Sequence, residues 1–224
     1  MSADLALERT LLDGGYRRVI AIDEVGRGAL AGPVSVAAVV IDVDVIAVDP
    51  PAGIDDSKRL TAKRRREMRG PIVSWVRGHH VGHAEATRID EVGIMVALGE
   101  AASAAIDGLP AGDDNNDNFD NDDDDDDDAS TFSVVLLDGT FDFLTPVRPG
   151  FEVRTVVGGD GRCASIAAAS ILAKEERDEL MRRWHRVHPQ YGWDTNVGYA
   201  AASHRRAIAE FGACDLHRRS WRLV

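Results

Sequence analysis

Two apolar runs near the start of the chain enclose a short acidic and glycine-rich segment. Residues 19–23 and 34–41 are rich in β-branched side chains, so both are predicted to be buried strands. Asp23-Glu24 closes the first strand, where carboxylates cost free energy unless a cation or hydrogen-bond donors satisfy them. The glycines of Gly26-Arg27-Gly28 allow the backbone to approach a ligand closely, and the arginine suits phosphate. The segment predicts a site for a metal and a polyanion, with a solvated loop as the alternative.

Helices and strands alternate along the rest of the chain. The patterns first predict a loop over 42–53 and a helix over about 61–69, capped by Thr61 and stopped by Gly70-Pro71. A strand within 72–86 follows, and then a helix over 87–108 with a capping box of Thr87 and Asp90. The remaining predicted elements are strands at 133–138 and 153–157, a long helix over about 162–187 and a shorter helix over 203–211. With its early antiparallel stretch, this order indicates a mixed α/β sandwich. The length suits a single domain over 1–224.

The net charge of −12 is concentrated in one segment. Residues 113–128 contain eleven aspartates, and without them the net charge is −1. Because the segment at about 111–130 has almost no apolar residues, we predict a disordered acidic insertion in a surface loop. Basic residues cluster elsewhere, as in Lys63-Arg64-Arg65-Arg66, so the overall acidity does not exclude a nucleic-acid partner.

The sequence contains no sign of a membrane protein or a secreted one. No apolar stretch is long enough to span a bilayer, and charges interrupt the leucines of the first 18 residues. The two cysteines, Cys163 and Cys214, lie far apart and form no metal-binding or redox motif. We expect a cytoplasmic protein with no membrane association.

Four carboxylates are candidates for a shared metal site: Asp23, Glu24, Asp138 and Asp160. Neighbouring strand ends lie about 5 Å apart, so acids placed there can share cations. Oxygen ligands without nearby His or Cys favour Mg²⁺ or Mn²⁺, and two such ions suit in-line displacement at phosphorus. Asp138 could instead be a turn residue, and Asp160 a helix N-cap. Asp178, inside the long predicted helix, is interpreted as a structural residue or a charge partner.

Several short blocks of sequence occur together in a characteristic order between residues 18 and 221. They are Asp23-Glu24-Val25-Gly26-Arg27-Gly28, Leu30-Ala31-Gly32-Pro33-Val34, Asp56-Ser57-Lys58, Leu137-Asp138-Gly139, Gly159-Asp160, residues 166–174, Arg177-Asp178, Gly198-Tyr199 and His217-Arg218-Arg219-Ser220-Trp221. In these blocks the sequence resembles type 2 ribonucleases H, the ribonuclease HII family. The resemblance implies the ribonuclease H fold, a central mixed sheet flanked by helices with a C-terminal helical portion. It also implies that the four candidate acids are catalytic and bind metal.

The resemblance further implies how the substrate is held. Gly26-Arg27-Gly28 would read the 2′-hydroxyl of a ribonucleotide, and Tyr199 would stack on the neighbouring deoxyribose. Ser57 and Lys58 match residues that contact phosphate. The alternative for Tyr199 is an ordinary, partly buried aromatic residue.

Three positions depart from the family's pattern. Gly158 and Val197 stand where the family often has lysine, and Glu175 stands where a small apolar residue is common. We expect these changes to weaken phosphate binding and to leave the metal chemistry intact, with Glu175 adding a local negative charge.

The activity implied by the resemblance is hydrolysis of the RNA strand of RNA–DNA hybrids by a monomeric, metal-dependent endoribonuclease. Its substrates would include single ribonucleotides embedded in duplex DNA, cut on their 5′ side to leave a 3′-hydroxyl and a 5′-phosphate. Two alternatives are a less selective nuclease on the same acids, and a non-catalytic protein that binds hybrids. A two-carboxylate glycosidase fits less well, because aromatic residues for a sugar platform are scarce.

Overall fold

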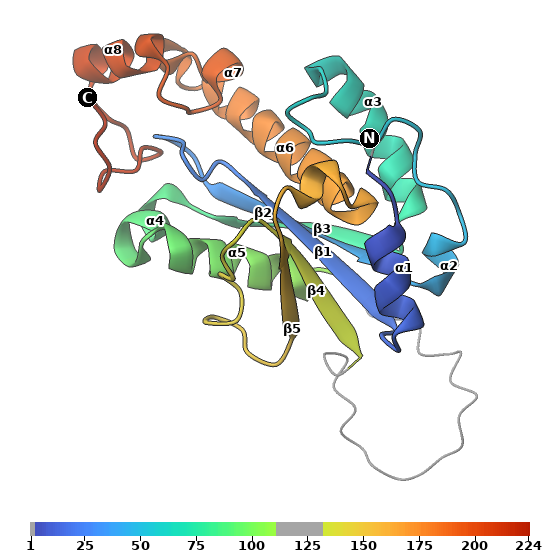
Figure 1. Cartoon of the computed structure of the whole chain (residues 1–224). Coiled ribbons are helices and arrows are strands. Elements are labelled where there is room, and N and C mark those ends of the chain that lie inside the picture. The colour runs from blue at the N-terminus through green and yellow to red at the C-terminus, as the bar shows by residue number, and fades with distance from the viewer. Residues whose placement is uncertain (1–2, 111–131) are drawn as a thin grey trace.

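The computed structural model describes residues 3–110 and 132–224 (Figure 1). Its centre is a five-stranded sheet in the order β3-β2-β1-β4-β5. The strands are β1 (Arg18–Val25), β2 (Val34–Ile41), β3 (Gly78–Ala84), β4 (Ser133–Asp138) and β5 (Glu152–Val156). Strand β2 pairs antiparallel with both β1 and β3, whereas β1, β4 and β5 are parallel. This mixed sheet confirms the predicted fold class.

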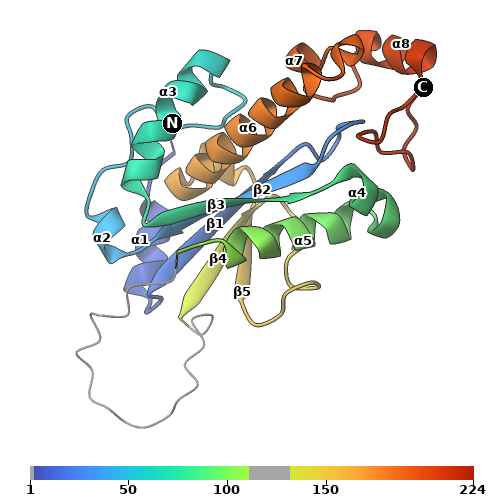
Figure 2. The same cartoon turned by 180° about the vertical axis from the view of Figure 1, so that it is seen from behind.

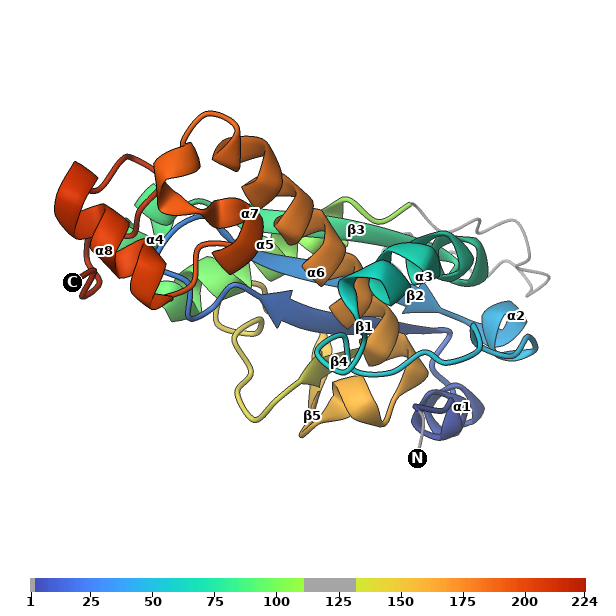
Figure 3. The same ribbon diagram turned by 90° about the horizontal axis from the view of Figure 1, so that it is seen from above.

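Helices cover both faces of the sheet. They are α1 (Ala6–Asp13), α2 (Val43–Ile46), α3 (Ala62–Trp75), α4 (Ala86–Val92), α5 (Ile94–Asp107), α6 (Ala164–His185), α7 (Trp193–Asn196) and α8 (Ala202–Phe211), with short 3-10 helices η2 (Gly159–Gly161) and η3 (Pro189–Tyr191). Helix α6 crosses one face beside α3, and α5 covers the other (Figures 2 and 3). Helices α7 and α8 continue beyond the end of α6 as the predicted C-terminal helical portion.

Alternation along the strands decides which side chains face which layer. On β1, Val19 and Ala21 belong to the core beneath α6, whereas Ile20 and Ile22 belong to the core beneath α5. Because successive side chains point to opposite faces, the next residue, Asp23, faces α6. On β4 the same alternation directs the side chain of Asp138 to the α6 face, after Val134 and Leu136 of that core.

Two helix boundaries differ from the predictions. Helix α3 begins after the predicted cap Thr61, but it continues through Gly70-Pro71 to Trp75. Burial of Met68 and Ile72 on one face outweighs the hydrogen bond that the proline cannot donate. The predicted helix over 87–108 is two helices, because Gly93 adopts φ +80° between them.

The predicted capping box is also wrong. Helix α4 has Glu85 at its N-cap rather than Thr87. The carboxylate of Asp90 instead accepts hydrogen bonds from the backbone N–H groups of Arg219 and Ser220, at 2.7 and 3.0 Å. This contact fastens the C-terminal segment to α4.

Three helices were not predicted from the sequence: α1, α2 and the short α7. Helix α2 lies within the predicted loop over 42–53, capped by Asp42. Helix α1 packs against the start of α6, where Glu8 accepts hydrogen bonds from the backbone N–H and hydroxyl of Ser165. The predicted acidic insertion at about 111–130 lies outside the described residues. Within the described residues, no helix is long and apolar enough to cross a membrane.

Candidate active site

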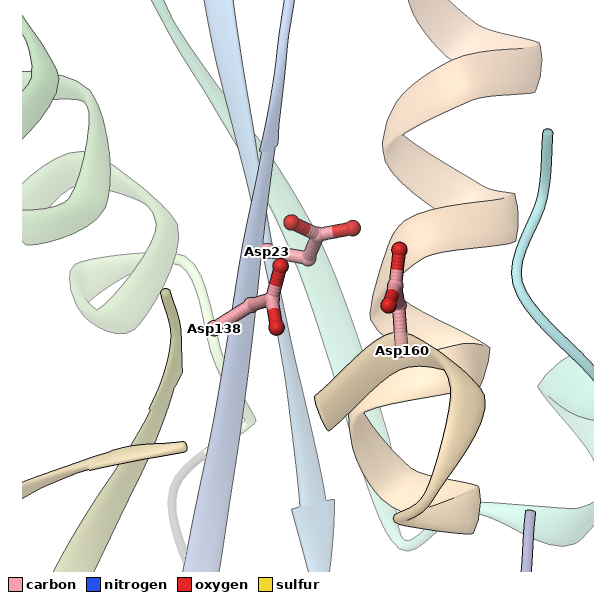
Figure 4. Close-up of side chains that lie close together, drawn as sticks. All are labelled: Asp23, Asp138 and Asp160. Atoms are coloured by element: carbon pink, nitrogen blue, oxygen red, sulfur yellow. The ribbon is translucent and has the colours of Figure 1, made fainter. Parts of the chain in front are cut away.

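Three of the four predicted acids meet in one place. Asp23 at the end of β1, Asp138 at the end of β4 and Asp160 in η2 each offer a carboxylate oxygen, and these oxygens lie within 4.8 Å of one another (Figure 4). The first two face α6 because of strand alternation, and η2 immediately precedes α6. The parallel pairing of β1 with β4 aligns Ile22 with Leu137, so the acids that follow are neighbours.

The alternative interpretations of Asp138 and Asp160 are wrong. The N-cap of α6 is Cys163, so Asp160 does not cap the long helix. Asp138 accepts a hydrogen bond of 2.7 Å from the backbone N–H of Gly159, which holds η2 against the end of β4. Asp138 therefore contributes to the cluster and also fixes the position of Asp160.

Burial and mutual repulsion make the cluster electrostatically unfavourable. Asp23 is only 4% exposed. Its burial, followed by the negative charges of Glu24, Asp138 and Asp160, raises its pKa well above the ordinary value. Burial and the charge of Asp138 also raise the pKa of Asp160. Carboxylates with raised pKa values in one cleft are stabilised when cations bind between them.

The ammonium group of Lys58 provides one such positive charge. Its Nζ lies 3.2 Å from Asp160 and 4.0 Å from Asp56. Burial alone would lower the pKa of Lys58, but the charge of Asp160 opposes this and the pKa is raised. Lys58 therefore lies at the rim of the acid cluster.

Glu24 lies beside the cluster but outside the group of three. Strand alternation turns its side chain away from that of Asp23. Burial and the charge of Asp138 raise the pKa of Glu24, while Arg27 and Lys58 act in the opposite direction. Its carboxylate thus feels the same site electrostatically, although it does not share the oxygen cluster.

The donor set fits hard divalent cations. The ligand atoms are all carboxylate oxygens, with no thiolate or imidazole among the three grouped residues. Such oxygen-only sets suit Mg²⁺ or Mn²⁺ better than Zn²⁺. Burial and the neighbouring carboxylates raise the pKa of Asp23, and a cation bound among these oxygens would stabilise its charged form.

The two glycines of the Gly26-Arg27-Gly28 turn have different reasons to be glycine. Gly26 has φ +86°, and a Cβ atom there would lie 2.2 Å from Nε of Arg177. Gly28 has no atom within 4 Å of the equivalent position, so its missing side chain leaves open space. The fold therefore requires the first glycine, while the second leaves room for a ligand.

Two buried arginines donate hydrogen bonds to backbone carbonyls in and after this turn. Arg218 donates hydrogen bonds to the carbonyl oxygens of Gly26 at 2.7 Å, Arg27 at 2.9 Å and Gly32 at 3.1 Å. Burial, followed by the charge of Arg177, lowers the pKa of Arg218 to about 9. Arg177 donates to three further carbonyls, those of Ala31, Pro33 and Val197, at 2.9 to 3.0 Å.

Tyr199 lies against the same turn. The backbone N–H of Gly26 donates a hydrogen bond of 3.2 Å to the hydroxyl of Tyr199. The guanidinium of Arg177 lies 5.6 Å from the centre of the tyrosine ring. The structure thus places the predicted glycine turn and Tyr199 side by side, although they are 173 positions apart in sequence.

Ser57 is more deeply placed than a surface phosphate contact would be. It is 4% exposed, and its hydroxyl accepts a hydrogen bond of 2.8 Å from Ser170 on α6. Arg65 donates to the carbonyl of Ser57 at 3.0 Å and forms an ion pair with Glu175 at 3.0 Å. The expected extra negative charge of Glu175 is therefore offset by Arg65, whose ion pair secures the loop before Lys58.

The interpretation of Asp178 as a charge partner is confirmed. Its carboxylate forms ion pairs with Lys174 at 2.5 Å and with Arg65 at 3.6 Å.

The two positions where the family often has lysine share an unusual backbone conformation. Gly158 has φ +63° and Val197 has φ +43°, a region that β-branched residues rarely adopt.

Sequence reasoning missed the roles of Arg65, Arg177 and Arg218. Arg65 is one residue of a basic run, and nothing in its neighbours distinguishes it from the exposed ones. Arg177 and Arg218 lie in blocks that carry the family resemblance. The resemblance marked these two positions but did not indicate what their side chains contact.

A mixed sheet with a helix packed over grouped carboxylates at its strand ends has the ribonuclease H fold. Two solved structures share this fold: ribonuclease H2 from Pyrococcus horikoshii (TM-score 0.66, 20% identity, 92% of this chain and 94% of that one) and ribonuclease HII in a PCNA complex from Archaeoglobus fulgidus (TM-score 0.67, 24% identity, 92% and 96%).

Sequence comparison identifies the family within that class. The family model described as Ribonuclease HII matches residues 20–224. Ribonuclease HII of Paracoccus denitrificans is 40% identical, covering 97% of this chain and 91% of the relative, and that of Streptomyces avermitilis is 38% identical, covering 96% and 82%. The chain belongs to the ribonuclease HII family. It is a metal-dependent endoribonuclease, and the family cleaves the RNA of RNA–DNA hybrids.

Proposed function

We propose that this enzyme recognises single ribonucleotides embedded in duplex DNA, as well as longer RNA–DNA hybrids, and cuts on the 5′ side of the ribonucleotide. The observation that supports this most directly is the contact of Tyr199 with the Gly26 backbone. A turn with open space at Gly28 lies beside a partly exposed aromatic ring, near the carboxylates of β1. This arrangement suits the simultaneous reading of a 2′-hydroxyl and an adjacent sugar.

In this proposal Asp23, Asp138 and Asp160 hold two divalent cations, Mg²⁺ or Mn²⁺, with Glu24 completing the set. When bound, such ions activate water and stabilise the leaving oxygen, which yields a 3′-hydroxyl and a 5′-phosphate. The chain's own part is to fix these carboxylates at the ends of rigid strands and in η2. Asp138 serves both purposes, because it also holds Gly159.

Positive side chains around the acids would bind the nucleic-acid backbone. Lys58 is paired with Asp160 in this structure, and cations on Asp160 would free its ammonium group for a substrate phosphate. Arg27 is exposed on the turn and can take the same role. Ser57 acts as a support for Lys58 more readily than as a direct contact, because its hydroxyl is bonded to Ser170.

Recognition of the ribose would come from the turn itself. The carbonyls of Gly26 and Arg27 are bonded to Arg218, so the turn is held in one shape before substrate arrives. A preformed turn favours a substrate with a 2′-hydroxyl without paying for reorganisation on binding.

Cleavage assays with three matched duplexes test the proposal. One contains a single ribonucleotide in DNA, the second a continuous RNA strand opposite DNA, and the third only DNA. With Mg²⁺ we expect cutting of the first two, and a 5′-phosphate and 3′-hydroxyl at the position 5′ to the ribonucleotide. Equal cutting of the all-DNA duplex would support the less selective nuclease. Cutting of the continuous hybrid alone would contradict the proposed recognition of single ribonucleotides.

A further inference from the structure

A chain of buried hydrogen bonds ends on the backbone of Tyr199. Its members are Trp193, His204 and His217, which are 0%, 0% and 1% exposed. They come from α7, from α8 and from the C-terminal segment that follows it. The rings pack together, with 5.3 Å between the centres of the two imidazoles and 6.2 Å between those of Trp193 and His204.

The partners of His217 fix where its proton lies. The backbone N–H of Cys214 donates to Nδ1 of His217 at 3.1 Å, and the Cys214 thiol lies 3.3 Å from the same nitrogen. Nδ1 is therefore the acceptor, and in a neutral ring the proton is on Nε2. That Nε2–H lies 3.2 Å from Nε2 of His204, to which it can donate.

The partners of His204 fix the opposite arrangement. An indole N–H can only donate, and Nε1 of Trp193 lies 3.0 Å from Nε2 of His204. The single lone pair on Nε2 of His204 accepts from Trp193 and is shared with the longer contact from His217, so the proton of His204 must be on Nδ1. Nδ1–H then donates to the backbone carbonyl of Tyr199, at 2.8 Å.

Both rings must be neutral for this arrangement to hold. A proton added to Nε2 of His204 would point at two other N–H groups. Burial lowers the pKa of His204. Burial, followed by the charge of His204, lowers the pKa of His217 to about 4. The two imidazoles form a fixed series of donors that ends on the backbone of Tyr199.

Tyr199 is consequently held at both ends. Its carbonyl accepts from His204, and its hydroxyl accepts from Gly26 in the turn that follows β1. The angle at which the ring meets a substrate sugar depends on both contacts. The backbone of Tyr199 also bonds to Ala201 at 2.8 Å and to Asn196 at 2.9 Å, so loss of the His204 contact would shift the ring relative to the turn and leave the carboxylates in place.

We propose that His204 and His217 are positioning residues that set the preference of the enzyme for single embedded ribonucleotides, by fixing Tyr199 through their opposite tautomers. The inference rests on the proposed function, in which Tyr199 contacts the sugar next to the ribonucleotide. A purely structural role in the C-terminal core would instead lower stability and reduce cleavage of every substrate equally.

Two substitutions of His204 separate these roles. In His204→Asn the amide nitrogen takes the place of Nδ1 and can still donate to Tyr199. In His204→Gln the amide lies at the place of Nε2, so the bond to Tyr199 is lost while Trp193 can keep a partner. The measured quantity is kcat/KM on a duplex with one ribonucleotide, divided by kcat/KM on a continuous hybrid.

We expect this ratio to fall about ten-fold in His204→Gln, because a small misplacement of a substrate-positioning group lowers the rate by this factor or more. In His204→Asn the ratio should stay within about two-fold of wild type. In a Tyr199→Ala background, His204→Gln should change the ratio no further, because the two act through one contact. An unchanged ratio in His204→Gln, or an additional loss in the double variant, would overturn the inference.

The result for Tyr199→Ala shows whether a negative outcome contradicts the inference about His204 and His217 or the proposed function itself. If Tyr199→Ala leaves the ratio unchanged, the proposed role of Tyr199 is wrong and the inference falls with it. If Tyr199→Ala lowers the ratio and His204→Gln does not, the inference alone is wrong.

Nitrogen-15 NMR of the histidines in the wild-type protein provides a test that needs no variant to fold. Near neutral pH it should show His204 protonated on Nδ1 and His217 on Nε2. A charged ring, or the same tautomer in both, would contradict the arrangement.

Discussion

Replacing Asp23 by asparagine should remove activity and at the same time stabilise the metal-free protein. At an effective dielectric constant of about 20, two unit charges 4.8 Å apart repel by about 3.5 kcal/mol. The wild-type protein relieves part of this by holding the pKa of Asp23 high, so we expect a net gain of about 2 kcal/mol. For a domain of this size that corresponds to a rise in Tm of about 4–8 °C.

The new amide should not create an unsatisfied group. Its oxygen can accept the hydrogen bond that the Glu24 N–H donates to Asp23 at 2.8 Å, and its nitrogen can donate to Asp138 or Asp160. Removal of metal-dependent turnover should therefore not be a consequence of unfolding.

Thermal unfolding in EDTA and in Mg²⁺ measures this effect, alongside cleavage of a continuous hybrid. Mg²⁺ at 100 times its Kd should stabilise wild type by about 2.7 kcal/mol, and the variant much less. Asp178→Asn is the matched control of opposite sign, because Asp178 is paired with Lys174 and Arg65 and its neutralisation should lower Tm. A variant at position 23 that melts no higher than wild type in EDTA, or that keeps its Mg²⁺-dependent rate, would refute the reasoning.

Three further outcomes are expected. Tyr199→Ala should lower cleavage at a single ribonucleotide by about ten-fold or more relative to a continuous hybrid, as loss of one stacking contact would; equal losses in parallel kinetic assays would indicate general packing. Lys58→Gln should tighten Mg²⁺ binding, because Lys58 competes for Asp160 at 3.2 Å, and should raise KM for substrate; calorimetric titration with Mg²⁺ and steady-state kinetics test the two directions separately. His217 has a folded pKa of about 4 against an ordinary 6.5, so its neutral form contributes stability that is complete above about pH 6.5 and declines as pH falls towards 4. Between about pH 7 and pH 5, denaturant unfolding should show wild type losing about 2 kcal/mol more than His217→Gln; parallel pH profiles would contradict the pKa assignment.

The strands and the acids could be predicted because they depend on local patterns. Apolar runs located β1, β2 and β4, and the runs of β1 and β4 end in the acids that the structure places in the cluster, Asp23 and Asp138. Strand alternation, read from the sequence alone, would also have placed Asp23 and Asp138 on one face. The helix around Pro71 was harder, because burial of Met68 and Ile72 depends on tertiary packing rather than on the local sequence.

The surroundings of the turn could not be predicted for a different reason. Apart from the carbonyl of Val197, the carbonyls that Arg177 and Arg218 contact lie 144 to 192 positions away, and no periodicity or spacing records such contacts. The same is true of His204 and His217, whose roles depend on which nitrogen meets which partner. Sequence resemblance marked some of these residues, and only the fold shows what they contact.

The bond from Arg218 to the turn has a consequence for the order in which the enzyme becomes functional during translation. A ribosome makes the chain from its N-terminus, so the carbonyl of Gly26 exists long before the guanidinium 192 positions later that holds it. Asp160, the last of the proposed metal ligands, also precedes Arg218, by an interval of roughly 3 to 12 s at usual elongation rates. A chain stopped within that interval carries every acid of the site but lacks the clamp on its recognition turn. In the proposed function, discrimination between ribose and deoxyribose would therefore be the last property that synthesis provides.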